Sequence, residues 1–297
     1  SGSADRVADG ATVNLENGGI WMLDGDDTVD QFNSSGLLNG GSTLTAAQFD
    51  LSDGAEVPAG TNLGGGQLVS SSGSVYLSGD AAAEDVDVTG GTLDLKGQLT
   101  GVTDLTISNG ATLQSGSADR VADGATVNLE NGGLWMLGGD DTVGVLNSSG
   151  LLNGTGTLNA PTYNLSNGAE TGAGANLGSG QLNSGPGEVA LNGDAAAEDV
   201  NVNSGNLNLN GELTGVTDLD ISSGATVNLG SAERIDDEAT VNNNGGNFSL
   251  NGAEIVGEYN SAGQLTGTGT LTASQYNLSD GAETGAGANL GSGQLNS

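Results

Sequence analysis

Internal repetition is the feature that most constrains how this chain can fold. Residues 1–19 and 115–133 are identical, and a third copy starts near Leu229. One residue is missing early in that third copy, after which the match to the second copy resumes. The 297-residue chain therefore divides into three tandem segments, which we expect to form one continuous solenoid without internal linkers: copy 1 (1–114), copy 2 (115–228) and a partial copy 3 (229–297).

A second, shorter period lies inside each copy. Apolar–polar–apolar triplets recur, such as Val200-Asn201-Val202 and Leu219-Asp220-Ile221. This alternation is typical of a half-buried β-strand. Equivalent triplets lie about 20 residues apart, and Ser-Gly, Asn-Gly and Gly-Gly pairs between them supply the positive φ angles that sharp turns need.

Strands of three to five residues at this spacing fit one coil of a β-solenoid, in which the equivalent strands of neighbouring coils stack in parallel. The sequence therefore predicts an all-β fold, a right-handed parallel β-solenoid (β-helix) with coils of about 20 residues and roughly five or six coils in each copy. An antiparallel sandwich or barrel shows similar alternation, but nothing in such a fold requires the constant spacing. Disorder agrees with the high charge but not with apolar triplets in phase, and the L-x-x-L-x-L frame of leucine-rich repeats is absent.

The charge and composition exclude several classes of function. Asp and Glu number 37 against 4 Lys and Arg, which gives a net charge of −33, and the chain contains neither His nor Cys. Such a chain cannot neutralise the phosphates of nucleic acid, and it is repelled by anionic membrane surfaces. Without imidazole or thiol groups it lacks the usual zinc, haem and iron–sulfur ligands. No apolar stretch approaches the ~18 residues of a membrane span, so we expect neither a nucleic-acid partner nor membrane insertion.

Catalysis by paired carboxylates is the remaining enzymatic option, since such pairs hydrolyse glycosides. A catalytic set is normally unique in its chain, whereas almost every carboxylate here has a counterpart one copy away. The cations that would bind an acidic sugar or stabilise an oxyanion are nearly absent. We therefore expect a protein that is not an enzyme and needs no cofactor.

Aromatic residues make up only 3% of the chain, yet they occur in register between the copies. A structural role that repeats once per copy, such as packing a corner, explains this placement. The equivalent sets are Trp21, Trp135 and Phe248; Phe49, Tyr163 and Tyr276; and Phe32, Leu146 and Tyr259.

One acidic segment, residues 23–30 (LDGDDTVD), offers candidate ligands for a metal. Asp24, Asp26, Asp27 and Asp30 flank a glycine turn, and clustered carboxylates are the oxygen ligands that Ca²⁺ prefers. The EF-hand frame and the calcium-binding nonapeptide of some solenoids are both absent, and the later copies keep few of these acids. The segment is therefore either a solvated acidic corner or a calcium site formed by these four residues.

Two other patterns repeat in phase. The sequence DAAAED occurs at residues 80–85 and 194–199, and it predicts one helical turn, capped by Asp80 or Asp194, that leaves the coil. One arginine per copy lies among many acids, which predicts a local ion pair; these arginines are Arg6, Arg120 and Arg234, flanked by Asp5, Asp119 and Glu233.

Three segments carry a resemblance to a known group of proteins: GTLDLKG at 91–97, GGLWMLG at 132–138 and GLLNGTGTL at 150–158. They look like the strand repeats of bacterial autotransporter passengers and filamentous-haemagglutinin-like exoproteins. The resemblance is in composition and rhythm and extends over the whole chain. It implies a right-handed parallel β-helix on the bacterial surface that serves as an adhesin, stalk or matrix fibre.

From these observations we expect a non-enzymatic structural segment of an extracellular bacterial surface fibre. Its partners would be further copies of itself, either through continuation into a longer tandem array or through self-association. The alternative is an adhesive module of a large exoprotein, which binds calcium at its acidic corners or surface glycans through Trp21 and Trp135.

Overall fold

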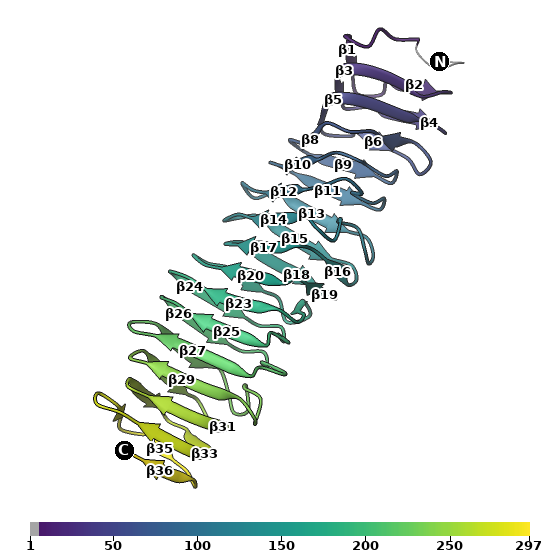
Figure 1. Cartoon of the computed structure of the whole chain (residues 1–297). Helices are drawn as coiled ribbons and strands as arrows, with labels where there is room; N and C mark the ends of the chain where they lie inside the picture. The colour runs from purple at the N-terminus through teal and green to yellow at the C-terminus, as the bar shows by residue number, and fades with distance from the viewer. Residues whose placement is uncertain (1–5) are drawn as a thin grey trace. The chain divides into compact units, whose positions relative to one another are not determined.

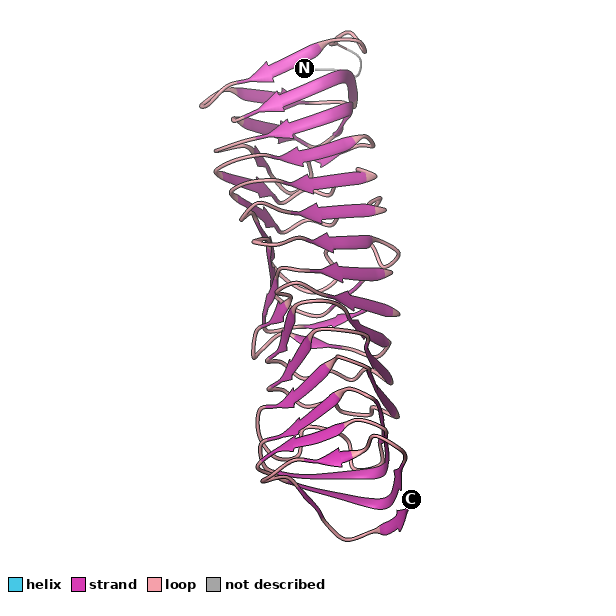
Figure 2. Ribbon diagram, turned by 90° about the vertical axis from the view of Figure 1, so that its left-hand side faces the viewer, coloured by secondary structure: helices cyan, strands magenta, loops and turns pink. Residues whose placement is uncertain are grey.

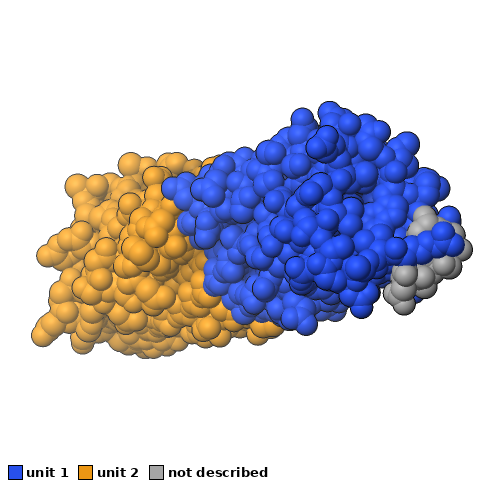
Figure 3. Space-filling view, turned by 90° about the horizontal axis from the view of Figure 1, so that it is seen from above, with its two compact units in different colours: residues 1–156 blue, residues 157–297 orange. Residues whose placement is uncertain are grey.

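The computed structural model describes residues 6–297 and contains two compact units, Ser1–Gly156 and Thr157–Ser297, which Figure 3 shows in different colours. Each unit is an all-β parallel β-solenoid, and the chain makes roughly 15 turns with coils about 19 residues apart. The predicted fold class is therefore confirmed, and the antiparallel sandwich, disorder and the leucine-rich repeat are excluded. The boundary between the units falls inside repeat copy 2, so units and copies do not coincide.

Two ladders of parallel strands form the main sides of unit 1 (Figures 1 and 2). Ladder A consists of β1 (Thr12–Leu15), β3 (Asp27–Ser34), β5 (Thr43–Leu51), β8 (Gln67–Ser70), β10 (Asp85–Val88), β12 (Asp104–Ile107), β14 (Thr126–Leu129) and β17 (Val145–Ser148). Ladder B consists of β2 (Ile20–Leu23), β4 (Leu37–Gly40), β6 (Glu56–Val57), β9 (Ser74–Leu77), β11 (Thr92–Leu95), β13 (Thr112–Ser115), β15 (Leu134–Leu137) and β18 (Leu151–Gly154).

Unit 2 is likewise built from two ladders of parallel strands. Its ladder A consists of β20 (Thr162–Leu165), β23 (Gln181–Ser184), β25 (Asp199–Val202), β27 (Asp218–Ser222), β29 (Thr240–Asn244), β31 (Ala253–Ser261), β33 (Thr270–Leu278) and β36 (Gln294–Asn296). Its ladder B consists of β21 (Glu170–Thr171), β24 (Glu188–Leu191), β26 (Asn206–Leu209), β28 (Thr226–Leu229), β30 (Asn247–Leu250), β32 (Gln264–Gly267) and β34 (Glu283–Thr284).

A shorter third side closes each coil. It contains β7 (Asn62–Leu63) and β16 (Asp141–Thr142) in unit 1, and β19 (Thr157–Asn159), β22 (Asn176–Leu177) and β35 (Asn289–Leu290) in unit 2. Single-residue parallel bridges continue this side, as where Ala81 lies between Leu63 and Leu99.

The prediction of a helical turn at residues 80–85 and 194–199 is wrong, because neither segment is helical. Ala81 and Ala83 are buried while Ala82 is exposed, so the three alanines keep the alternation of an extended chain. Asp80 does not cap a helix; its Oδ1 accepts a hydrogen bond from the backbone N–H of Gln98, one coil further on (2.9 Å). Asp194 bonds the N–H of Glu212 in the same way (2.9 Å).

In most four-residue strands of both ladders the second and fourth residues point into the core. In β9, for example, Val75 and Leu77 are fully buried while Tyr76 between them is exposed. Parallel pairing in register places each inward residue on its equivalent in the next coil, so that Leu93 lies between Val75 and Leu113. These columns bury most of the aliphatic side chains. Removal of this apolar surface from water makes the main favourable contribution to the stability of the fold.

No helix among the described residues meets the length and apolar character needed to cross a membrane.

Candidate functional site

The four predicted metal ligands lie in the loop before β3 and in the first half of β3, but their carboxylates do not converge on one point. Asp24, Asp26 and Asp30 are exposed, whereas Asp27 is buried. Asp26 Oδ1 accepts the backbone N–H of Thr43 (2.8 Å), and this bond ties the loop to the next coil. Within residues 6–297 no group of three or more carboxylates is placed to hold a metal ion. The four residues therefore form no ready-made calcium cage, and calcium binding stays a prediction.

Asp27 belongs to a repeated position at which each copy buries a carboxylate. The equivalents are Asp141 and Glu254, each 1% exposed. Asp141 Oδ2 accepts the backbone N–H groups of Arg120 (3.1 Å) and Val121 (3.3 Å) from the preceding coil. Glu254 bonds the N–H groups of Arg234 and Ile235 in the same way (2.8–3.1 Å). The buried carboxylate thus holds the corner of one coil against the next.

Burial raises the pKa of two of these corner acids, Asp141 and Glu254. Removal from water raises the pKa of Asp141 to about 6, although the N–H groups of Arg120, Thr142 and Val121 favour the charged form and oppose the shift. Burial likewise raises the pKa of Glu254 above its usual range, against its backbone hydrogen bonds and the charge of Arg234. Asp141 and Glu254 therefore bind a proton more readily than exposed carboxylates do.

The predicted ion pair is found at Arg234, although its partner is not the acidic neighbour in the sequence. Arg234 Nη1 lies 3.5 Å from Glu212 Oε1, one coil earlier, rather than beside Glu233. The guanidinium of Arg120 donates hydrogen bonds to Ser117 Oγ. Asp5, the expected partner of Arg6, lies outside the described residues.

The in-register aromatics lie in or against the core. Trp135 and Phe248 are fully buried, and Trp21 at the same position is half-buried. Trp135 Nε1 donates to Ser115 Oγ inside the coil (2.8 Å). Its indole therefore presents no face to a glycan, which argues against stacking of a sugar on Trp135.

The set Phe49, Tyr163 and Tyr276 is buried as well. The Tyr163 hydroxyl donates to the carbonyl of Leu158 and accepts the N–H of Ala160, both at 2.8 Å. Tyr276 makes the equivalent pair of bonds. Because the Tyr163 side chain is buried, its pKa rises to about 12. These tyrosines satisfy backbone groups at a bend and so fix the corner.

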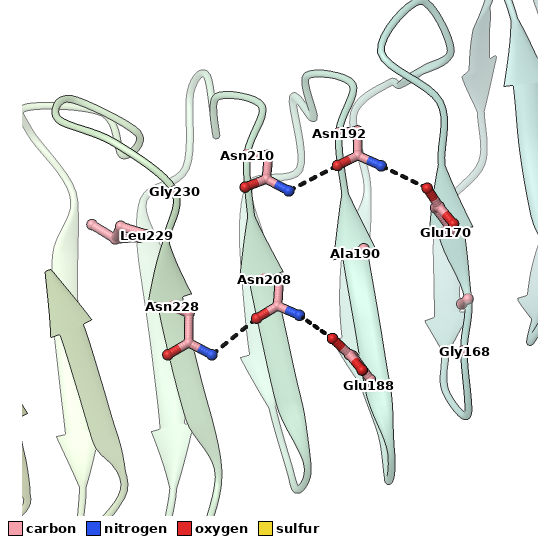
Figure 4. Close-up of a pocket in the computed structure, with 11 residues that line it drawn as sticks. Gly168, Glu170, Glu188, Ala190, Asn192, Asn208, Asn210, Asn228, Leu229 and Gly230 are labelled. Carbon is pink, nitrogen blue, oxygen red and sulfur yellow. Dashed lines mark hydrogen bonds between the residues drawn. The ribbon is translucent and has the colours of Figure 1, made fainter. Parts of the chain in front are cut away.

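A polar groove lies on ladder B of unit 2 (Figure 4). It has a volume of about 540 Å³ and is lined by four asparagines and two glutamates of neighbouring coils. Two rows of hydrogen bonds cross it, each ending at a carboxylate: Asn228 to Asn208 to Glu188 (2.9 and 2.8 Å), and Asn210 to Asn192 to Glu170 (2.8 and 2.9 Å). Ala190 lies between the two rows (Figure 4).

The groove can bind groups that donate hydrogen bonds. Its lining contains carboxylates and amide oxygens but no Lys or Arg, so it suits a hydroxyl or an ammonium group and repels anions. Sequence reasoning missed it, although one signal was present. Copy 1 has Tyr76 at the position of Ala190, and Asp94 at that of Asn208.

Comparisons with known protein families, curated proteins and solved structures give no match for this chain.

Proposed function

We propose that this chain is a non-enzymatic structural segment of an extracellular bacterial surface fibre, in which the stacked coils act as a stiff scaffold. The observation that supports this most directly is the uniform stacking of coils in both units. Each coil pairs with its neighbours through two ladders of backbone hydrogen bonds. Because every coil is bonded to the coils before and after it, the stack is one continuous hydrogen-bonded scaffold, which suits a structural segment.

Surface side chains reinforce the stack from outside. On ladder A of unit 2, Asn277 Nδ2 donates to Asn260 Oδ1 (2.7 Å), and Asn296 Nδ2 donates to Asn277 Oδ1 (2.8 Å). In unit 1, Asn33 donates to Asn14 and Asn147 donates to Asn128. Such asparagine rows add to the stability of stacked parallel strands.

The extracellular placement rests on the resemblance of the strand repeats to autotransporter passengers and related exoproteins. The net charge of −33 agrees with it, because a highly charged surface keeps scaffolds soluble and apart.

Electron microscopy of the producing cells tests the proposal. Immunogold labelling with an antibody against the recombinant chain should decorate filaments outside intact cells. The register places six coils in one 114-residue copy, so the filament should show an axial repeat of about 29 Å at the ~4.8 Å spacing of parallel strands. An antibody against a cytoplasmic protein is the control. Label confined to the cell interior, or found only on compact particles, would contradict the proposal.

A further inference from the structure

The Asn-Gly pairs of the chain fall into two structural groups. Five pairs lie where the chain passes from ladder A to ladder B: Asn17-Gly18, Asn109-Gly110, Asn131-Gly132, Asn167-Gly168 and Asn244-Gly245. Five others lie at the ends of ladder B strands: Asn39-Gly40, Asn153-Gly154, Asn192-Gly193, Asn210-Gly211 and Asn251-Gly252. We call the first group the A–B pairs and the second group the B-end pairs.

An asparagine that precedes a glycine can lose its side-chain amide without an enzyme, which makes it a labile residue. The backbone nitrogen of the glycine attacks the side-chain carbonyl carbon, and a C–N bond forms. The side-chain nitrogen leaves as ammonia, together with the proton that the glycine nitrogen gives up. Water then opens the cyclic imide at either carbonyl and yields aspartate or isoaspartate. Because the nitrogen must move against the side chain, the reaction is slow where the fold holds the glycine in place.

The glycines of the B-end pairs are held by the preceding coil. None of the five is exposed, and a Cβ atom on each would lie 1.9–2.8 Å from a backbone atom of that coil. The Gly211 N–H donates to the carbonyl of Leu191 (3.0 Å), and the Asn210 side chain donates to Asn192 Oδ1 (2.8 Å; Figure 4). Neither the attacking nitrogen nor the amide can therefore move without breaking contacts between coils.

The A–B pairs are open to solvent instead. All five asparagines and all five glycines of this group are exposed. A Cβ atom on Gly132 would meet nothing nearer than 3.4 Å. The Gly133 N–H closes the turn by donating to the carbonyl of Glu130 (2.8 Å), so the Gly132 N–H takes no part in that bond. The Gly132 nitrogen can therefore turn toward the Asn131 amide while the coils stay stacked.

One A–B pair is held more firmly than Asn131-Gly132. The Gly168 N–H donates to the carbonyl of Glu188 (2.7 Å), and the Asn167 N–H donates to the carbonyl of Pro186 (2.8 Å). Exposure alone therefore does not decide reactivity, and we expect Asn167 to react more slowly than Asn131.

We propose that Asn131, together with its equivalent Asn17 in copy 1, is a site of spontaneous deamidation, and that the fold protects the B-end pairs. Each event replaces a neutral amide with a carboxylate and adds a negative charge to a chain whose net charge is −33. The isoaspartate product also lengthens the main chain of the turn by a methylene group, for which the open turn has room. This modification goes beyond the scaffold function, because it makes one corner of the stack more acidic as the protein ages.

Ageing of the folded wild-type chain tests this selection. The purified chain is incubated at mildly alkaline pH, where the glycine nitrogen loses its proton more readily, and is then digested with pepsin in acid, where the reaction is slow. Mass spectrometry with electron-transfer fragmentation locates each converted asparagine and distinguishes isoaspartate from aspartate. Asn131 should convert at least about tenfold faster than Asn192 and Asn210, which corresponds to a barrier difference of ~1.4 kcal/mol.

Two controls separate the fold from the local sequence. In guanidinium chloride the chain is unfolded, and Asn131, Asn192 and Asn210 should convert at similar rates. Asn131→Ser is the matched variant, since Ser223-Gly224 already forms a turn of this kind between β27 and β28. This variant should melt like the wild type and lose conversion at residue 131, while Asn192 and Asn210 stay unmodified as before.

The proposal is overturned if Asn131 and Asn192 convert at equal rates in the folded chain, because stacking of the coils would then give no protection. It is equally overturned if Asn131 converts in guanidinium chloride but not in the folded chain. None of these results bears on the scaffold function, which filament imaging tests separately.

Discussion

A single buried carboxylate links the stability of a coil corner to pH. Asp141 has a folded-state pKa of about 6 against an ordinary value of 3.8, so folding favours its protonated form. Its contribution to stability is fully present below pH 3.8 and is lost as the pH rises through about 6. In Asp141→Asn this dependence is absent. We expect the unfolding free energy of the wild type, relative to this variant, to fall by about 2 kcal/mol between pH 4 and pH 7, as measured by urea denaturation at several pH values.

Asp140→Asn is the matched control, because it removes the same charge from the exposed neighbouring residue. The unfolding free energy of the wild type relative to this control should not fall across the same pH range. A stability difference between the wild type and Asp141→Asn that rises with pH would show that the three N–H groups bonded to Asp141 outweigh the effect of its burial.

The sequence predicted the acidic segment at residues 23–30 but not which acid turns inward. Exposure of Asp24, Asp26 and Asp30 agrees with a solvated corner, whereas burial of Asp27 does not. A comparison of the copies contains the missing signal, because only the position of Asp27 keeps an acid in all three. The bonds themselves were not predictable, since they reach the backbone of another coil some 20 residues away.

The turn that joins two strands depends on glycine where neighbouring coils approach closely, because there is no room for a side chain. A Cβ atom on Gly211 would lie 2.1 Å from the carbonyl oxygen of Gly193 in the preceding coil. This oxygen is a backbone atom and cannot rotate away as a flexible side chain could, so the two coils would have to separate. We expect Gly211→Ala to lower the unfolding free energy by at least about 2 kcal/mol, as measured by chemical denaturation.

Gly124→Ala provides the comparison, because a Cβ there meets nothing within 4 Å. Alanine restricts the unfolded chain, so this variant should be neutral or slightly more stable. Equal loss of stability in both variants would mean that close stacking of the turns does not limit the corner.

Strands were the most predictable elements, because alternation and turn glycines are both visible in the sequence. The segments at residues 80–85 and 194–199 were misread because alanine favours helices. Stacking on the neighbouring coils overrides that preference. Ala81 and Ala83 both point inward, and Ala81 lies in one column with Leu63 and Leu99 on the short third side.

For the whole chain, the constant spacing of the apolar triplets in the sequence was enough to predict the stacking of coils. The expected coil length was about 20 residues, and the coils of the structure are about 19 residues apart. The polar groove was beyond such reasoning. Its walls come from Glu170, Glu188 and Asn208 on three successive coils, and whether outward side chains enclose a hollow depends on their sizes together. The inward columns constrain the strands far more tightly, because a one-residue slip within a strand turns its inward side chains to the outside.

Deletion of one complete coil tests that register. Gln181 pairs with Asp199, so removing residues 181–198 joins Gly180 to Asp199 and lets β20 pair with β25 as it paired with β23. Inward residues still meet inward residues, because Leu182 and Val200 occupy the same column. We expect this variant to keep the β-sheet circular dichroism spectrum and to unfold cooperatively within about 5 °C of the wild type. Removing only residues 181–189 cuts a coil partway and shifts ladder A against ladder B. That shorter deletion should cost far more stability, and if it melts no lower than the complete-coil deletion, the coil is not the unit from which this chain is assembled.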